Sequence, residues 1–291
     1  MKIVSIIGGL GNQMFQSALA LALEKHFSGT DDIRIDTRAF RGYSIHGGYE
    51  LKRIFGVNIP EASVRDVMRI AYPFINYRIW QLCRYLPKRR TMKFEGKSMS
   101  FDERIFTEHS DTYLIGYWQT ERYFRHIRQD ILMAFAFPPF EPGSINAKFG
   151  KELDHQCSVS IHIRRGDYLK ISNTLGICTI DYYRKAISKM KELVIPDIYV
   201  IFSDDIEWCK DNFGTSIGNT EIKFVNWNKG KDSYRDMQLM SLCKHNIIAN
   251  SSFSWWGAWL NQNPNKNVIA PSRWMNSEGW SEIIPSDWIK I

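Results

Sequence analysis

The chain of 291 residues lacks any hydrophobic run long enough to cross a bilayer, which takes about 20 apolar residues. It has no Cys-x-x-Cys pair and no spacing typical of a metal site, and its five cysteines are scattered singly. No internal repeat or low-complexity tract is visible. These absences disfavour a membrane-spanning protein, a zinc protein and a solenoid. Scattered cysteines are typical of a reducing compartment, so we expect a cytoplasmic globular protein.

The amino terminus resembles a signal peptide in its apolar residues but lacks a continuous apolar segment. The apolar stretch Ile3–Ile7 is interrupted by Gly8-Gly9 and again by Gly11-Asn12-Gln13. A signal peptide needs a continuous apolar segment. We interpret this region as a strand, a glycine loop and a helix.

Acidic residues are scarce in one segment. Between Arg65 and Lys93 stand eight basic residues and one acid, Asp66, an excess equal to the whole chain's net charge of +7. Aromatic and aliphatic residues are interleaved with the basic ones, a pattern that suits an anionic membrane surface. Nucleic-acid binding is a second interpretation, and a helix with its basic face in water is the plain alternative.

The second half alternates strand-like and helix-like segments, which predicts a parallel sheet with helical crossovers in a Rossmann-like unit. The predicted strands are Ser158–Ile163, Asp197–Phe202, Glu221–Val225, His245–Ala249 and Asn267–Ala270. The predicted helices are Ile180–Leu193, Ile206–Phe213, Ser233–Cys243 and Phe253–Asn261.

The first half begins in the same way and then becomes irregular. Its predicted strands are Lys2–Ile7, Ile33–Asp36 and Thr112–Tyr117, and its predicted helices are Asn12–Phe27, Arg65–Leu86 with a break at Pro73, and Glu121–Phe135. The densest group of helix breakers is Pro138-Pro139, Pro142 and Gly143. We therefore predict an α/β chain of two Rossmann-like domains, residues 1–143 with a helical insertion and residues 144–291.

Residues 162–168, His-Ile-Arg-Arg-Gly-Asp-Tyr, stand at the end of a predicted strand. Open α/β sheets bind ligands beyond the carboxyl ends of their strands. The guanidinium groups of Arg164 and Arg165 match phosphate oxygens in bidentate geometry, and Gly166 permits close backbone approach. This pattern indicates a phosphate site; a strand end solvated by charges is the alternative.

Three segments together resemble the α1,2-fucosyltransferases of glycosyltransferase family 11. Residues 162–168 resemble that family's donor-phosphate motif and, more distantly, that of the α1,6- and protein O-fucosyltransferases. Residues 8–16 resemble the amino-terminal signature, and residues 250–260 resemble the carboxyl-terminal one. The three lie far apart in the family's order, and the similarity spans nearly the whole chain.

The resemblance implies the glycosyltransferase-B architecture, in which two Rossmann-like domains face a cleft. It implies inverting transfer of L-fucose from GDP-L-fucose, bound by the second domain, to the 2-hydroxyl of a galactose. The family is metal-independent, so we expect no metal and no other cofactor. The chain contains no Asp-x-Asp sequence, although Asp204-Asp205 could in principle ligate magnesium.

The resemblance also assigns donor-binding roles. Arg164 is the first candidate for the β-phosphate, with Arg165 supporting it or ordering the loop, and His162 lies near the guanine. Residues that start a predicted helix face the pyrophosphate, where helix capping is the alternative role for the serines. These residues are Asn250, Ser251, Ser252 and Phe253. The neighbouring Trp255, Trp256 and Trp259 are expected to be core residues.

Two further assignments rest on related fucosyltransferases. Asp236 stands 15 residues before Ser251, the spacing of an aspartate that accepts hydrogen bonds from guanine N1 and N2. Asn12 corresponds to an asparagine beside the reacting groups. The glutamate of the α1,6 enzymes that follows their motif histidine by some ten residues is Ser172 here, so their base cannot be transferred. Asp36 and His46 are the candidates that remain for a base.

The expected acceptor is a galactose-terminated oligosaccharide of a bacterial O-antigen or surface glycan. A lipid-linked acceptor at the inner face of the cytoplasmic membrane would give residues 65–93 a function. One alternative is a metal-independent transferase that uses another nucleotide sugar. The other is a basic nucleotide- or nucleic-acid-binding protein; we expect no nucleic acid, because the charge excess lies away from the phosphate-like motifs.

Overall fold

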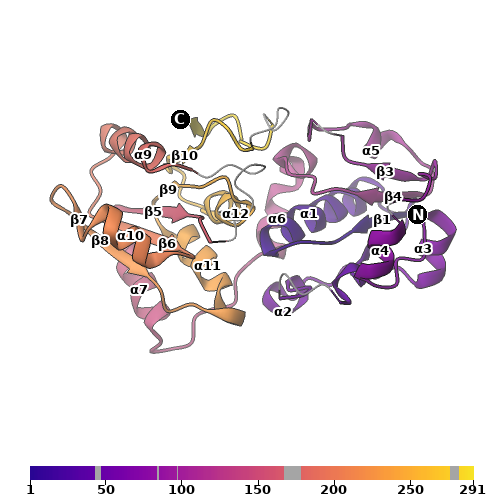
Figure 1. Ribbon diagram of the computed structural model, residues 1–291, viewed down its shortest axis with the longest axis horizontal. Coiled ribbons are helices and arrows are strands. Elements are labelled where there is room, and N and C mark those ends of the chain that lie inside the picture. The colour runs from indigo at the N-terminus through magenta and orange to yellow at the C-terminus, as the bar shows by residue number, and fades with distance from the viewer. Residues whose placement is uncertain (43–46, 84, 97, 167–177, 276–281) are drawn as a thin grey trace. The chain divides into compact units, whose positions relative to one another are not determined.

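The computed structural model describes residues 1–291 except 43–46, 84, 97, 167–177 and 276–281. It divides into two compact α/β units, Met1–Pro138 and Pro139–Ile291 (Figure 1). The division falls at residue 138 rather than 143, within the predicted cluster of breakers. His46, Ser172 and the Asp167-Tyr168 end of the phosphate-like motif lie outside the described residues.

The amino-terminal unit is built on a parallel sheet of four strands in the order β2-β1-β4-β3. Its strands are β1 (Lys2–Ser5), β2 (Ile33–Asp36), β3 (Met92–Phe94) and β4 (Thr112–Ile115). Its helices are α1 (Leu10–His26), η1 (Arg38–Phe40), α2 (Leu51–Phe55), α3 (Val64–Ile70), α4 (Tyr77–Cys83), α5 (Arg104–Thr107), η2 (Glu121–Tyr123), η3 (Arg125–Ile127) and α6 (Arg128–Ala134).

Local sequence explains where several of these helices begin and end. Ser63 and Asp66 form a reciprocal capping box that starts α3. The predicted break at Pro73 is confirmed, because α3 ends at Ile70 and α4 begins at Tyr77. The single predicted helix 121–135 is wrong at its start: two short 3-10 turns precede α6, and Phe124 between them has φ −137°.

The carboxyl-terminal unit has a seven-stranded sheet in the order β11-β10-β9-β5-β6-β8-β7, parallel except for the β7–β8 hairpin. Its strands are β5 (Ser158–Ile163), β6 (Ile198–Ser203), β7 (Ser216–Ile217), β8 (Thr220–Val225), β9 (His245–Ile247), β10 (Val268–Ala270) and β11 (Ile289–Lys290). Its helices are α7 (Ile145–Asp154), α9 (Ile180–Leu193), α10 (Ile206–Phe213), η5 (Gly230–Asp232), α11 (Tyr234–Leu242) and α12 (Ser252–Leu260).

Helix α12 is buried from Ser254 to its last residue, Leu260. Trp255, Trp256 and Trp259 are 0–2% exposed and pack on one another. Gly257 lets α11 approach closely, because a Cβ there would lie 3.0 Å from the Cβ of Met240. The tryptophans are therefore core residues, as predicted, and they fix the position of the amino terminus of α12.

Both sheets have a point where the strand order reverses. In the carboxyl-terminal unit the chain runs outward from β5 through β6 to β8 and then returns to place β9 on the other side of β5. In the amino-terminal unit the same reversal separates β1 from β4. Ligands of open α/β sheets bind at the carboxyl ends of the strands on either side of such a point. Among the described residues, no helix has the length and apolar character of a membrane span.

Candidate functional site

Arg164 stands at the carboxyl end of β5, next to the reversal point of the larger sheet. Its Nη1 lies 3.2 Å from Oδ2 of Asp204, which follows the neighbouring strand β6. The two side chains are 31% and 26% exposed. An ion pair at such exposure contributes little free energy. The guanidinium can therefore exchange this carboxylate for a phosphate at small cost.

Arg165 is held both by an aromatic ring and by carboxylates. Its guanidinium carbon lies 3.9 Å from the ring centroid of Trp208, and its Nε lies 3.3 Å from Oδ2 of Asp205. Its backbone N–H donates to Asp204 at 2.9 Å. A cation stacked and paired in this way orders the loop that presents Arg164.

The adjacent carboxylates of Asp204 and Asp205 are occupied by protein donors. Asp204 accepts from Arg165 N–H through Oδ1 and contacts Arg164 through Oδ2. Asp205 caps α10 by accepting from the N–H of Trp208 through Oδ1, and its Oδ2 faces Arg165. Three of the four oxygens thus contact Arg164 or Arg165, and the fourth caps α10. The described residues contain no group of three His, Cys, Asp or Glu placed to hold a metal ion.

His162 is the last but one residue of β5 and is 5% exposed. Burial and, to a smaller extent, the nearby charge of Arg164 lower the pKa of its imidazole to about 3. Its ring centroid lies 5.9 Å from that of Phe253 on α12. The imidazole is therefore neutral, and its buried Nδ1 makes no hydrogen bond within the described part of the chain.

The amino terminus of α12 lies after β9, across the reversal point from β5. Ser251 is its N-cap residue, yet its hydroxyl makes no capping hydrogen bond. The first N–H groups of a helix have no partner within the helix and favour an anion. Asn250 has a different role: its Nδ2 donates to the carbonyl of Trp274 at 3.0 Å, and its Oδ1 lies 3.4 Å from Sγ of Cys178. Asn250 therefore anchors the loop, and Ser251 and Ser252 remain the side chains available to a ligand.

Asp236 lies in the first turn of α11, at the same edge of the larger sheet. Its Oδ1 accepts a hydrogen bond from Nδ2 of Asn228 at 2.8 Å, and Asn228 is bonded in turn to Asn146 at 2.7 Å. Burial raises the pKa of the Asp236 carboxyl to about 7, against the lowering effect of the Asn228 bond. The bond from Asn228 orients the carboxyl and leaves lone pairs on both of its oxygens for a ligand's donors.

In the amino-terminal unit, Asn12 lies in the first turn of α1, beside the reversal point between β1 and β4. Its Oδ1 accepts from Nε2 of Gln119, in the loop after β4, at 2.7 Å. Gly8 has φ +94°, and a Cβ there would lie 2.8 Å from the Asn12 Nδ2. The glycine loop and Gln119 therefore fix the orientation of the Asn12 amide.

The two glutamines of the amino-terminal signature organise the loops around Asn12. Gln13 donates to the carbonyls of Gly8 and Gly48 at 2.9 and 2.8 Å. Gln16 accepts from the N–H of Ile7 at 3.0 Å and donates to the carbonyl of Gly116 at 2.9 Å. Both side chains are fully buried. The hydrogen bonds of Gln13 and Gln16 therefore hold in place the loops that surround Asn12.

Glu95, at the end of β3, holds the loop that carries Gln119. Its two oxygens accept from the N–H groups of Tyr117 at 2.7 Å and Trp118 at 2.9 Å. Burial raises the pKa of its carboxyl, and the N–H groups of residues 117–119 lower it in opposition. The loop includes Trp118 at φ +56°, a conformation that a bulky residue adopts only when its surroundings impose it.

Gly116 makes this arrangement possible, and its replacement is a test of it. A Cβ at residue 116 would lie 2.4 Å from the Cβ of Glu95, so Gly116→Ala must displace β3 or the loop. We expect a loss of about 1–3 kcal/mol in the free energy of unfolding, measured by urea titration. Gly47→Ala is the matched control, because the nearest atom to its Cβ lies at 3.6 Å. Equal stability of the two variants would contradict the proposed role of Glu95.

Asp36 does not have the environment of a general base. It is 3% exposed, and its Oδ1 accepts from Nε of Arg38 at 2.8 Å while its Oδ2 accepts from the hydroxyl of Tyr113 at 2.8 Å. Both oxygens are committed to protein donors, which corrects the expectation from sequence. No single pattern in the sequence pointed to Gln119, Glu95 or Asn228, because each acts by positioning another residue.

Comparisons with known proteins show the family of this chain. The model of glycosyl transferase family 11 matches residues 73–291. An alpha-1,2-colitosyltransferase of Escherichia coli is 34% identical over 99% of this chain and 98% of its own. The O-antigen biosynthesis glycosyltransferase WbnK of Escherichia coli is 30% identical over 98% of both chains. Galactoside alpha-(1,2)-fucosyltransferase 2 of Mus musculus is 26% identical over 88% of this chain and 67% of its own.

Among solved structures, the chain resembles the alpha-1,6-fucosyltransferase NodZ soaked with GDP-fucose. The TM-score is 0.50 at 16% identity, over 89% of this chain and 91% of NodZ, which shows a shared fold. The α/β fold with parallel sheets and the family resemblance predicted from the three motifs are thus confirmed. The chain belongs to glycosyl transferase family 11 and is a glycosyltransferase.

Proposed function

We propose that the enzyme transfers L-fucose from GDP-L-fucose to the 2-hydroxyl of a galactose, with inversion at the anomeric carbon. The observation that carries the proposal is the reversal point of the larger sheet, where Arg164 follows β5 and the uncapped amino terminus of α12 comes after the neighbouring strand β9. A guanidinium and free N–H groups on two sides form a receptor for a diphosphate.

The donor is assigned to the residues at this edge. Arg164 binds the β-phosphate, and Ser251, Ser252 and the backbone of Phe253 bind the pyrophosphate from the other side. Asp236 accepts from guanine N1 and N2 through its carboxylate, a pairing that adenine cannot make because its N1 is an acceptor. His162, neutral and with its ring 5.9 Å from that of Phe253, borders the nucleotide.

In the transfer step, the 2-hydroxyl oxygen of galactose bonds to the anomeric carbon of fucose while the bond from that carbon to the β-phosphate oxygen breaks. The pair of electrons of that bond leaves on GDP, and its developing charge is stabilised by Arg164 and the N–H groups of α12. The hydroxyl proton passes to a base. Asn12 orients the acceptor or the sugar–phosphate linkage through its fixed amide.

The two α/β units are proposed to be the two halves of a glycosyltransferase-B enzyme, with the acceptor on the amino-terminal unit. No metal or other cofactor takes part in this proposal, since Arg164 and the helix terminus supply the positive charge that a metal supplies elsewhere. We place the enzyme in the cytoplasm, with residues 65–93 on the inner face of the membrane and a lipid-linked O-antigen-type glycan as acceptor.

A second donor is favoured by the relative that is 34% identical over 99% of the chain, a colitosyltransferase. Colitose is 3-deoxy-L-fucose, so a GDP-linked form would present the same guanine and diphosphate to the same residues. The choice between the two sugars depends on contacts to the 3-hydroxyl alone.

Donor and linkage are tested together with one β-galactoside acceptor. Each of GDP-L-fucose, GDP-colitose, GDP-mannose and UDP-galactose is offered separately, and products are analysed by NMR for the substituted hydroxyl. We expect turnover with GDP-L-fucose at least tenfold above the others and substitution at O-2 of galactose. Preference for GDP-colitose would replace the donor and keep the site, whereas substitution at another hydroxyl would refute the acceptor assignment.

A further inference from the structure

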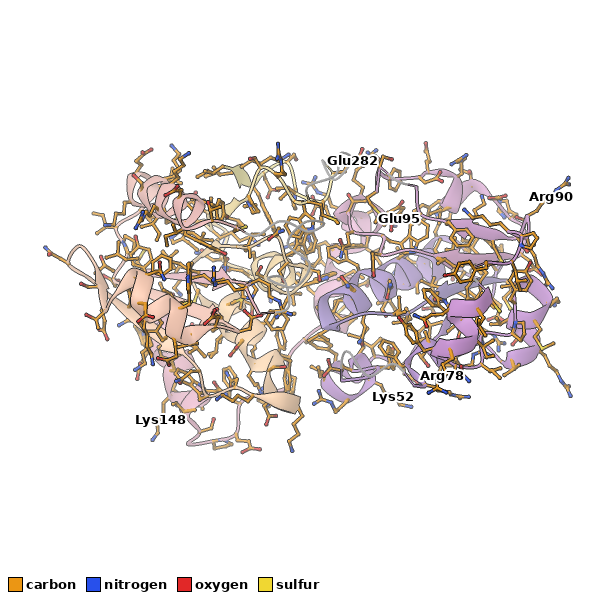
Figure 2. All side chains as sticks on the ribbon, viewed as in Figure 1. Lys52, Arg78, Arg90, Glu95, Lys148 and Glu282 are labelled. Atoms are coloured by element: carbon orange, nitrogen blue, oxygen red, sulfur yellow. The ribbon has the colours of Figure 1, made fainter. Side chains whose placement is uncertain are left out.

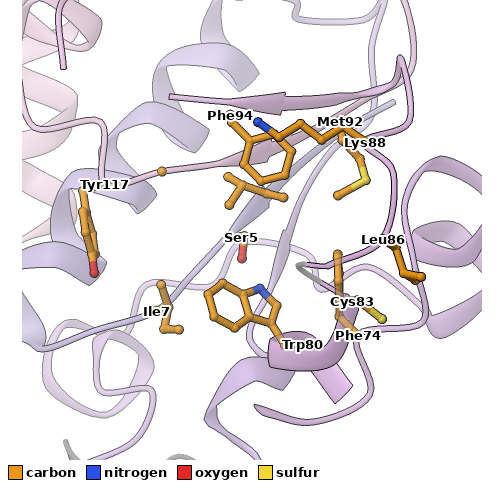
Figure 3. A pocket seen from close by; sticks show the side chains of 12 residues that line it. Ser5, Ile7, Phe74, Trp80, Cys83, Leu86, Lys88, Met92, Phe94 and Tyr117 are labelled. Atoms are coloured by element: carbon orange, nitrogen blue, oxygen red, sulfur yellow. The ribbon is translucent and has the colours of Figure 1, made fainter. Parts of the chain in front are cut away.

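The amino-terminal unit contains an apolar cavity of about 250 Å³ that the transfer step does not use. Residues in and beside β1, β3 and β4 line one side, together with Lys88, and Phe74, Trp80 and Cys83 line the other (Figure 3). Its lining residues are Ser5, Ile7, Phe74, Trp80, Cys83, Leu86, Lys88, Met92, Phe94, Ile115, Gly116 and Tyr117.

The side chains that line the cavity are mostly apolar. Trp80 and Phe94 stand on opposite sides of the cavity, with Ser5 between them (Figure 3). The polar side-chain groups in the lining are the Ser5 hydroxyl, the Tyr117 hydroxyl, the Trp80 indole N–H, the Cys83 thiol and the Lys88 ammonium. A buried sugar needs partners for most of its hydroxyls. This lining instead matches a hydrocarbon.

The cavity reaches the surface, and its rim is apolar. Leu86 and Phe94 both line it and are 45% and 38% exposed. Leu82 and Tyr85, at and just beyond the end of α4, are 64% and 90% exposed. Exposed apolar side chains gathered around a cavity mark a binding surface.

Positive charge accompanies this rim. The Nζ of Lys88 lies 4.3 Å from the ring centroid of Phe94, so the ammonium sits over the rim of the cavity. Arg78, Arg89 and Arg90 are exposed on the same segment, and Figure 2 shows Arg90 projecting from the unit. An apolar cavity with the Lys88 ammonium at its rim, on a segment rich in exposed cations, complements a hydrocarbon chain joined to an anionic head group.

We propose that this cavity binds the first part of the hydrocarbon chain of an anionic amphiphile, the phosphate-bearing carrier lipid of the acceptor. The inference rests on the proposed function for the identity of that amphiphile as acceptor. The volume equals about eight water-sized volumes of about 30 Å³, so the cavity holds a segment of the chain and the remainder lies in the membrane. The head group lies at Lys88, beside Phe94 at the end of β3.

Binding is tested without turnover, using decyl phosphate brominated on its chain, below its micelle-forming concentration. Bromine quenches nearby indoles, so we expect partial quenching of tryptophan fluorescence in the parent protein. Trp80→Phe keeps an aromatic wall and should remove most of that quenching while affinity stays within about threefold. Each methylene buried should strengthen binding by up to about fourfold, so ethyl phosphate should bind far more weakly.

Two further variants separate the chain from the head group. Cys83→Phe places a ring in the cavity and should abolish the advantage of the long chain, whereas Tyr85→Ala, outside the lining, should not. Lys88→Glu should weaken the long- and short-chain phosphates by the same factor. If Cys83→Phe does not fold, the loss of quenching in Trp80→Phe still decides the question.

Three results would overturn the proposal: equal affinity for decyl and ethyl phosphate, undiminished quenching in Trp80→Phe, or displacement of the amphiphile by methyl β-galactoside, which would assign the cavity to the acceptor sugar. None of these depends on donor choice. Transfer to a soluble β-galactoside would persist if only the cavity proposal failed, and chain binding would persist if only the donor assignment failed.

Discussion

Replacing Arg164 with alanine is expected to lower kcat/KM for sugar transfer by a factor of about 10²–10³ while the protein stays folded. The loss is large because a guanidinium that faces a departing β-phosphate acts where charge develops. The fold should survive because Arg164 is partly exposed, and Asp204 keeps its second partner, the N–H of Arg165. Initial rates with GDP-L-fucose and a thermal unfolding curve measure the two quantities.

Three controls accompany the Arg164→Ala measurement. Arg184→Ala removes an exposed arginine of α9, paired with Asp181 at 3.6 Å, and should leave transfer unchanged. Arg165→Ala should lower the unfolding temperature as well as the rate, because it removes a cation packed on Trp208. The parent enzyme should keep its rate in excess EDTA if the arginine replaces a metal. Near-parental transfer by a folded Arg164→Ala variant would show that the phosphate lies elsewhere.

The two halves of the chain differ in how far their sequence predicts their structure. In the second half, the predicted bounds of β5, α9 and α10 coincide with the structure, because each is a local apolar pattern closed by a cap or turn. In the first half, β3 was missed: three residues, Met92–Phe94, become a strand only by pairing with β4. A strand that short carries no periodic signal of its own.

In the candidate site, too, local sequence predicted some residues, whereas contacts between distant segments decided the role of others. Arg164, Ser251 and Asp236 belong to segments whose sequence already indicates a ligand, and the sheet order brings the ends of β5 and β9 to one edge. Asn250 and Asp36 were plausible polar residues, yet their partners, the Trp274 carbonyl and Arg38, were fixed by the fold. Sequence therefore predicted which segments meet, and geometry was needed to tell ligand-facing groups from structural ones.

Asp236→Asn is expected to weaken GDP-sugar binding by about 10² at pH 8, because a carboxylate that accepts two guanine donors becomes an amide that accepts at one atom only and repels through its N–H group. Calorimetry with GDP-L-fucose measures the affinity. Asn228→Ala is the matched variant: it removes the 2.8 Å bond that orients the carboxyl and should weaken binding less than Asp236→Asn does.

The same carboxyl predicts a pH dependence of known sign. Its pKa in the folded protein is about 7, raised by burial from an ordinary value of 3.8. The ionised form binds guanine, so affinity for GDP-L-fucose should rise about tenfold per pH unit from pH 5.5 toward 7 and level off above it. GDP-L-fucose is the proper probe because its phosphates are both esterified and do not titrate near neutrality, as the terminal phosphate of GDP does.

Stability should move in the opposite direction, which separates recognition from misfolding. A carboxyl whose pKa is raised on folding destabilises the fold as pH rises from about 4 to about 7, since the native state must then hold a desolvated charge. Asp236→Asn should therefore match the parent in stability near pH 4 and exceed it above pH 7, while binding GDP-L-fucose worse throughout the neutral range. A variant that gains stability yet keeps the parent's affinity would show that Asp236 is merely a buried carboxyl, and the guanine would need another partner.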